Sequence, residues 1–325
     1  MRPFLLPVLA ICSLTVTLAR SQPSDGYWRQ ESASRVHDPS TIVRSGNEFW
    51  MFSTGIGIKS SRSTNLMDWQ PGQSVMPDMP TWVREVVPDQ RGHYWAPDII
   101  RVGERWLLYY SVSSFGKNVS ALALASNPTL DPKHPTFKWT DEGIILRSYR
   151  TNDFNAIDPA VTFDADGRLW MAFGSYWSGI KLVELDSITG RRIRPDSPMH
   201  SLAWNDHIEA AFIHRRATNY FLFLNWGQCC KGTNSTYEIR VGRSEKITGP
   251  YLDRERKDMM GGGGTLVLGS EGMFIGPGHA GIVNDGKQEW FSFHYYDGTN
   301  RGRPALGVRK LSWDKDGWPV VAKGD

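Results

Sequence analysis

The chain has 325 residues, a formal net charge of +3 at pH 7, 12% aromatic residues and 32 glycines. Its basic residues are scattered along the sequence, which argues against a nucleic-acid surface. The length would suit two average domains, but all-β domains commonly reach this size as one unit.

The first segment has the pattern of a secretory signal peptide. Met1-Arg2 is a short basic start, an apolar run extends from Phe4 to Leu18, and the small residues Ala19 and Ser21 follow. The run is too short for a membrane-spanning anchor. We therefore expect residues 1–21 to be a signal peptide and the mature protein, residues 22–325, to be secreted, either extracellular or periplasmic.

A unit of strand, tight turn and antiparallel strand recurs five times in the mature chain. In the clearest copy, Asp158-Pro159 precedes an apolar run, a turn rich in Asp and Gly covers 164–167, and a second apolar run returns. The period of roughly sixty residues is slightly longer than a typical four-stranded propeller blade. We predict an all-β fold, a five-bladed β-propeller in a single domain. A β-sandwich is the alternative, which five matching copies disfavour.

Alignment of the copies on their second strands places one residue from each at the same position. Equivalent positions of all blades face the central channel of a propeller, so these residues should converge near its axis. They are Asp38, Trp95, Asp158, Glu209 and His279. Asp38 and Trp95 are also expected to contact a substrate there.

Other stretches carry separate expectations. Residues 25–35 should lead into the first blade. The segment from Pro71 to Arg91 lacks periodicity and is predicted to be a long loop over one face, in which Trp82 would either contact a ligand or pack. The adjacent Cys229 and Cys230 are either a disulfide that stiffens a loop or two buried thiols.

Three carboxylates in one aromatic-lined pocket suit glycoside hydrolysis. One acid protonates the leaving oxygen, and a second carboxylate activates water or attacks the anomeric carbon. A third raises the pKa of the acid, because like charges disfavour a second ionisation. The alternative is a calcium site, since Ca²⁺ prefers oxygen ligands, but such ligands usually cluster along one loop.

Motifs along nearly the whole mature chain resemble glycoside hydrolase family 43, and specifically its endo-1,5-α-L-arabinanases. They include VHDP, HYWAPDI, NAIDPA, MAFGSYW, IEAAFI, CCKGTNSTY, GPGH and WDKDGWP. The resemblance implies a five-bladed propeller that hydrolyses arabinan or arabino-oligosaccharides with inversion of configuration. We expect it to act as a monomer.

The same resemblance assigns roles to individual residues. It makes Asp38 the general base and Glu209 the general acid, with Asp158 orienting the acid and adjusting its pKa. His279 would help to hold a hydrated metal ion, often calcium. The positions expected around the arabinose subsite are Phe115, Asn155, Ile157 and Ser175. Two departures from the family pattern are Ala211, where Pro is common, and Ala280-Gly281, where Asn-Ser is common.

Other functions remain open at this stage. An exo-acting α-L-arabinofuranosidase or β-xylosidase of the same family would share these motifs. A non-catalytic carbohydrate-binding propeller would have no need of all three acids. Invertase-like propellers are disfavoured, because His37 and Ile157 precede the two aspartates where those proteins are expected to have Asn and Arg. We expect no second domain after the fifth copy, and this expectation favours an open cleft and endo action.

Overall fold

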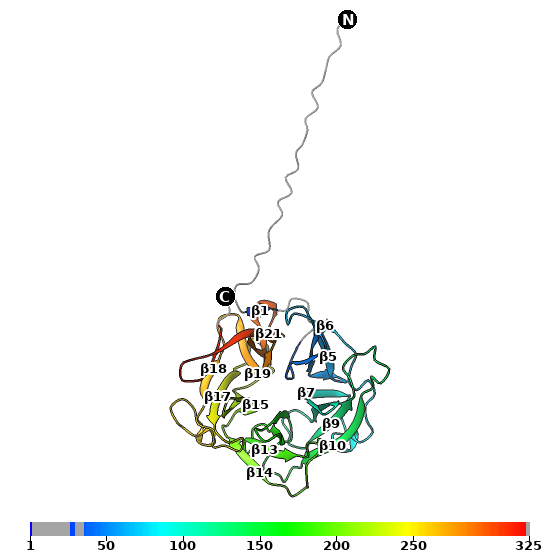
Figure 1. The fold of residues 1–325 in the computed structure, drawn as a ribbon, viewed down its shortest axis with the longest axis vertical. Helices are drawn as coiled ribbons and strands as arrows, with labels where there is room; N and C mark the ends of the chain where they lie inside the picture. The colour runs from blue at the N-terminus through cyan, green and yellow to red at the C-terminus, as the bar shows by residue number, and fades with distance from the viewer. Residues whose placement is uncertain (2–26, 30–35, 323–325) are drawn as a thin grey trace.

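The computed structural model describes residue 1, residues 27–29 and residues 36–322. Apart from Met1, the predicted signal peptide lies outside the described residues. Five antiparallel sheets surround a central axis (Figure 1), so the prediction of a five-bladed β-propeller is confirmed. Among the described residues, no helix is long and apolar enough to cross a membrane.

The blades follow one another in chain order. Blade one contains β2 (Val43–Ser45), β3 (Glu48–Ser53), β5 (Lys59–Ser63) and β6 (Gln70–Pro71). Blade two contains β7 (His93–Val102), β8 (Arg105–Val112), β9 (Ser120–Asn127) and β10 (Thr140–Ser148), with the short β4 (Gly55–Ile56) paired to β7. Blade three contains β11 (Ala160–Phe163), β12 (Leu169–Phe173), β13 (Ile180–Leu185) and β14 (Met199–Ala203).

Blade four contains β15 (Ile208–Arg216), β16 (Asn219–Trp226), β17 (Glu238–Ser244) and β18 (Thr265–Leu268). Blade five contains β19 (Phe274–Asn284), β20 (Glu289–Asp297) and β21 (Arg303–Trp313), and both β1 (Tyr27–Arg29) and β22 (Pro319–Val321) pair with β21. The short helices are α1 (Val83–Val86), η1 (Gly232–Asn234), η2 (Met259–Gly261) and η3 (Gly298–Asn300).

The amino-terminal strand closes the ring. Strand β1 pairs antiparallel with β21, and Figure 1 shows the two strands side by side. The expectation that this segment leads into the first blade is therefore wrong for residues 27–29, which belong to blade five. Hydrogen bonds between the two ends of the chain join that blade to the start of the fold.

The second strand of each blade is apolar on both faces because each blade packs against two neighbours. On β8, Leu107 and Tyr109 pack toward blade three, whereas Leu108 and Tyr110 pack toward blade one. Successive side chains of a strand point to opposite faces, so both sets must be apolar. One buried cluster of this kind fills each of the five blade interfaces.

The segment from Pro71 to Arg91 is packed rather than loose. It contains α1, and its Val75 and Val83 are buried in the cluster between blades one and two. The indole nitrogen of Trp82 donates a hydrogen bond to Asp141 Oδ2 on β10, 2.8 Å away. Trp82 therefore has the contacts of a packing residue on the outer strand of blade two.

Candidate active site

Each blade begins with a residue in the left-handed backbone region. The five residues have φ between 46° and 61°, although none is a glycine: Asp38, Ala96, Asp158, Ala210 and His279. A left-handed conformation costs free energy in a residue other than glycine, and residues in this conformation concentrate at functional sites. The structure therefore has five equivalent left-handed backbone positions, one in or before the inner strand of each blade.

Hydrogen bonds from the preceding blade hold four of these residues in a common way. The backbone N–H groups of Ala96 and Asp158 donate to the hydroxyl oxygens of Thr54 (2.8 Å) and Ser111 (2.9 Å). Those of His279 and Asp38 donate to Asn225 Oδ1 (2.9 Å) and His294 Nδ1 (3.1 Å). Each acceptor lies near the end of the second strand of the preceding blade.

The fifth position differs, and the difference brings two carboxylates together. In blade three the residue that corresponds to these acceptors is Gly174, which has no side chain. The correspondence follows from the backbone: the N–H of Gly174 donates to Ile157 O, just as the N–H of Thr54 donates to His37 O. The N–H of Ala210 donates instead to Asp158 Oδ2, 3.2 Å away. Asp158 therefore reaches across the blade interface to the residue that follows Glu209.

These five positions correct the alignment made from sequence. Asp38, Asp158 and His279 do share one position, but Trp95 and Glu209 lie one residue earlier. Their register partners are Ser111 and Asn225, whereas the left-handed residues of these blades are Ala96 and Ala210. The alignment slipped because an irregular extra residue interrupts strand pairing at these points.

The two closest contacts of the Asp38 carboxylate are made by one of its oxygens. Oδ2 accepts a hydrogen bond from Thr54 Oγ1 (2.6 Å) and lies 2.8 Å from His37 Nδ1. Oδ1 lies 3.5 Å from His279 Nδ1. Burial raises the pKa of Asp38, but the charge and hydrogen bond of His37 and those of His279 outweigh it and hold the pKa well below its ordinary value. Asp38 is therefore an ionised carboxylate.

Glu209 is buried and has a hydroxyl donor on each oxygen. Ser175 Oγ donates to Oε2 (2.7 Å), and the phenol of Tyr237 donates to Oε1. Burial and the charge of Asp38 raise the pKa of Glu209, while the two hydroxyl hydrogen bonds lower it, and the net direction is upward.

Asp158 is coupled to Glu209. Burial and the negative charge of Glu209 raise the pKa of Asp158 well above its ordinary value. Two buried carboxyl groups that interact this strongly do not both ionise, so the pair retains a proton at a pH where Asp38 has lost its own. The three carboxyl groups therefore differ in protonation, as a base and an acid must.

His279 and its neighbours are the candidate metal site. Burial lowers the pKa of His279, but its hydrogen bond to Asp38 and the charges of the nearby carboxylates outweigh this and raise it. The two groupings of three donor residues found among the described residues are His37–Asp38–His294 and His37–Cys229–Cys230, and neither includes His279. Calcium takes six to eight oxygen ligands. Among the described residues, these side chains do not form a calcium cage built from protein ligands alone.

The remaining predicted substrate residues occupy different surroundings. Ser175 contacts Glu209, as described above. Asn155 and Ile157 are buried, and Asn155 Oδ1 accepts a hydrogen bond from Ser120 Oγ. Trp95 is half-buried and its indole nitrogen bonds to His93 Nδ1. Phe115 is 77% exposed, which leaves its ring free to stack on a ligand. Substrate contact by these residues remains a prediction.

Several residues that hold the carboxylates were missed in the sequence. Tyr237 is the last residue of the CCKGTNSTY motif, but nothing in the motif shows that its phenol meets Glu209. Thr54, Asn225 and His294 come near the end of the second strand of their blades, a repeated position that an alignment of the five copies could have shown. Their polar side chains at the end of apolar strands were the available signal.

The site combines a candidate base, Asp38, with a candidate acid, the Asp158–Glu209 pair. This combination is the one that glycoside hydrolases use for acid–base catalysis. The model of glycosyl hydrolases family 43 matches residues 32–319. The chain belongs to this family.

Individual relatives agree with this assignment. An extracellular exo-α-(1→5)-L-arabinofuranosidase of Cellvibrio japonicus is 39% identical over 300 residues, covering 88% of this chain and 86% of the relative. An extracellular endo-α-(1→5)-L-arabinanase of Bacillus subtilis is 38% identical over 305 residues, covering 91% of each chain. The solved α-L-arabinanase of Cellvibrio cellulosa complexed with arabinohexaose has a TM-score of 0.85 and 38% identity, covering 89% of this chain and 96% of that one.

Proposed function

We propose that this protein is a secreted, inverting endo-1,5-α-L-arabinanase, which cleaves internal α-1,5-L-arabinofuranosidic bonds of arabinan. The observation that carries the proposal is the arrangement of three buried carboxyl groups within a family 43 propeller. Thr54 and His37 hold Asp38, Ser175 and Tyr237 hold Glu209, and Asp158 bonds to the residue that follows Glu209. The pKa of Asp38 is lowered and those of Asp158 and Glu209 are raised, which agrees with a base and an acid. Secretion is supported by the extracellular relatives and by the signal-peptide pattern of residues 1–21.

In the proposed reaction Asp38 is the general base. Thr54 and His37 occupy Oδ2, so Oδ1 is the oxygen that takes a proton from the attacking water. Water then attacks the anomeric carbon from the side opposite the leaving sugar, which inverts the configuration. The low pKa of Asp38 keeps this base ionised at neutral pH.

Glu209 is the proposed general acid, which donates its proton to the glycosidic oxygen as the bond breaks. Ser175 and Tyr237 fix its two oxygens, so the carboxyl group cannot turn away from the scissile bond. Asp158 accepts the N–H of Ala210, which places its carboxyl group next to that of Glu209. Because the two groups interact, the pair retains a proton that Glu209 can donate, and Asp158 itself does not react.

A hydrated calcium ion with His279 as its protein ligand remains part of the proposal. When bound, such an ion would add positive charge near Asp38. No step of the reaction above depends on it.

Exo action is the second candidate, because the Cellvibrio japonicus relative, named as exo-acting, is as similar to this chain as the endo-acting Bacillus relative. An exo enzyme needs a wall behind the terminal sugar. The long insertion from Pro71 to Arg91 is the candidate for such a wall. It contributes Val75 and Val83 to the core between blades one and two, and its Trp82 bonds to the outer strand β10. This packing favours a cleft open at both ends.

Digestion of debranched arabinan tests the proposal. Endo action predicts a rapid fall in viscosity and a mixture of short arabino-oligosaccharides in the first minutes. Arabinose as the sole early product, with viscosity hardly falling, would establish the exo enzyme instead. A Glu209→Gln variant is the control for contaminating activity, since it should release neither product.

A further inference from the structure

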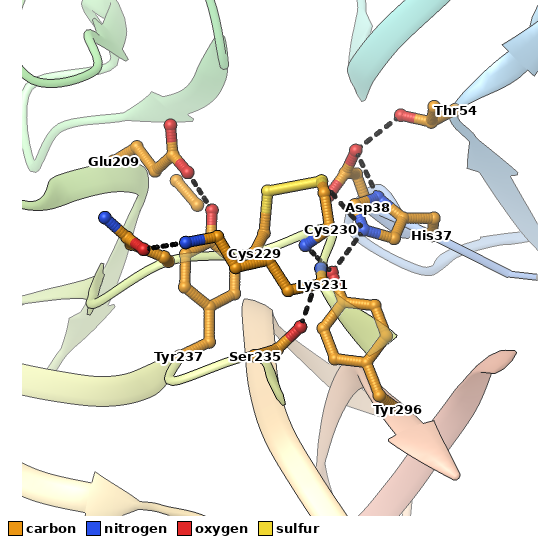
Figure 2. Close-up of a disulfide and its surroundings, with 12 residues drawn as sticks. His37, Asp38, Thr54, Glu209, Cys229, Cys230, Lys231, Ser235, Tyr237 and Tyr296 are labelled. Atoms are coloured by element: carbon orange, nitrogen blue, oxygen red, sulfur yellow. Dashed lines mark hydrogen bonds and ion pairs between the residues drawn. A yellow bond between two sulfur atoms is a disulfide. The ribbon is translucent and has the colours of Figure 1, made fainter. Parts of the chain in front are cut away.

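The disulfide between Cys229 and Cys230 lies beside the proposed general base, and the reaction described above gives it no role. It belongs to the loop that follows β16, and Cys230 Sγ is 3.8 Å from His37 Nε2 (Figure 2). Cys230 is exposed at the protein surface and Cys229 is half-buried. The pair therefore closes a small ring on blade four, in contact with His37, the residue that precedes the proposed general base Asp38.

A continuous chain of hydrogen bonds runs from this ring to Asp38 (Figure 2). The backbone N–H of Cys230 donates to the Tyr296 hydroxyl oxygen (2.7 Å), which lies 2.8 Å from His37 Nε2. Because that hydroxyl accepts from Cys230, its own proton is available for His37 Nε2. His37 then carries its proton on Nδ1 and donates it to Asp38 Oδ2, at 2.8 Å.

The members of this chain are fixed by other contacts. The ring of His37 stacks on His294, with centroids 4.2 Å apart, and His294 Nδ1 accepts the N–H of Asp38. The loop is pinned by a bond from Thr236 N to Gln228 O (2.9 Å) and another from Lys231 N to Ser235 Oγ (3.1 Å). A ring closed between adjacent residues restricts the direction of the Cys230 N–H further.

We propose that the Cys229–Cys230 ring, Tyr296 and His37 are positioning residues for the general base. They hold Oδ2 of Asp38 together with Thr54, so that Oδ1 faces the attacking water. Loss of the Tyr296 link would leave His37 held by stacking on His294, so its bond to Oδ2 would weaken and the Asp38 carboxylate would turn more freely. This inference rests on the proposed function, because it assumes that Asp38 is the base.

The first test is Tyr296→Phe, compared with Tyr251→Phe. Both tyrosines are buried, but the Tyr251 hydroxyl donates to Ile247 O within blade four, remote from the chain of bonds. On a linear α-1,5-arabino-oligosaccharide, Y296F should lower kcat about tenfold, in line with one lost hydrogen bond, and leave KM unchanged. Y251F should change neither. A Y296F enzyme with wild-type kcat would overturn the proposal.

A second substrate shows which carboxylate the link serves. A 4-nitrophenyl α-1,5-arabinobioside has a leaving group that needs little help from the acid. If Tyr296 acts through the base, Y296F should show the same deficit on this substrate. If the deficit disappears, Tyr296 acts on Glu209 and the proposal is wrong.

The disulfide is tested in the double variant Cys229→Ser/Cys230→Ser and by reduction of the wild type with dithiothreitol. Both should lower kcat at unchanged KM, and the double variant should not respond to the reductant. Full activity of wild-type enzyme whose two thiols are shown by mass spectrometry to be alkylated would refute the role of the ring. If Y296F does not fold, the double variant still tests the proposal. A wild type that leaves arabinan intact would instead overturn the proposed function.

Discussion

Replacement of Tyr237 by phenylalanine isolates one hydrogen bond to the proposed acid. The phenol of Tyr237 donates to Glu209 Oε1, and this bond lowers the pKa of Glu209 because it stabilises the ionised form. The substitution removes only the hydroxyl group. Ser175 continues to donate to Oε2, so the carboxyl group keeps its second anchor.

The expected shift follows from the strength of the lost bond. A hydrogen bond to a charged group contributes about 1.5–3 kcal/mol, and one pKa unit corresponds to about 1.36 kcal/mol. The pKa of Glu209 should therefore rise by about one to two units. A general acid acts in its protonated form, so a higher pKa extends activity upward, and the alkaline limb of the kcat/KM profile should move to higher pH by the same amount.

The assay is the pH dependence of kcat/KM on a linear α-1,5-arabino-oligosaccharide. Tyr109→Phe is the matched control, since Tyr109 is also buried but its hydroxyl donates to Gly190 O (2.7 Å) away from the carboxylates. Its profile should match that of the wild type. An alkaline limb that is unmoved or displaced to lower pH in Y237F would refute the assignment of Glu209 as the acid that Tyr237 tunes.

The remaining predictions concern the other carboxylates and the histidine. Asp38→Asn, Asp158→Asn and Glu209→Gln should each lower turnover about 10²–10⁴-fold without loss of the fold by circular dichroism, and near-normal turnover of any one would remove that residue from its role. Asp98 is 4% exposed and accepts the N–H groups of two neighbouring blades, at 2.9 and 2.8 Å. Asp98→Ala leaves both unpaired, so the free energy of unfolding should fall by about 2–6 kcal/mol; a change below about 1 kcal/mol in urea denaturation would contradict this. His279→Ala or chelation should lower activity or thermal stability, and if neither changes, His279 is only a packed histidine.

The sequence predicted the blades well because the repeat of apolar strands follows directly from packing. Each second strand is buried on both faces, so its apolar run is long enough to recognise. Because equivalent positions of the five repeats face the propeller axis, the sequence alone predicts that the first residues of the repeats lie close together. The convergence of Asp38, Asp158 and Glu209 could be inferred for this reason.

The errors arose where the backbone leaves regular geometry. Glu209 and Trp95 were misplaced by one residue because the irregular extra residues in β15 and β7 have no sequence signature of their own. The pairing of β1 with β21 joins segments nearly 280 residues apart, and a three-residue strand carries too little pattern to reveal its partner. The phenol of Tyr237 reaches Glu209 across its own blade, which only the three-dimensional structure can show.

The stereochemistry of the first product tests the central claim most directly. Proton nuclear magnetic resonance of the reducing ends, recorded immediately after enzyme is added to linear α-1,5-arabinan, should show the β-anomer first, because Asp38 directs water to the face opposite the leaving sugar. Inverting enzymes keep their two carboxyl groups about 6.5–9.5 Å apart to admit that water. Initial formation of the α-anomer would mean retention through a covalent intermediate and would contradict the assignment of Asp38 as a base.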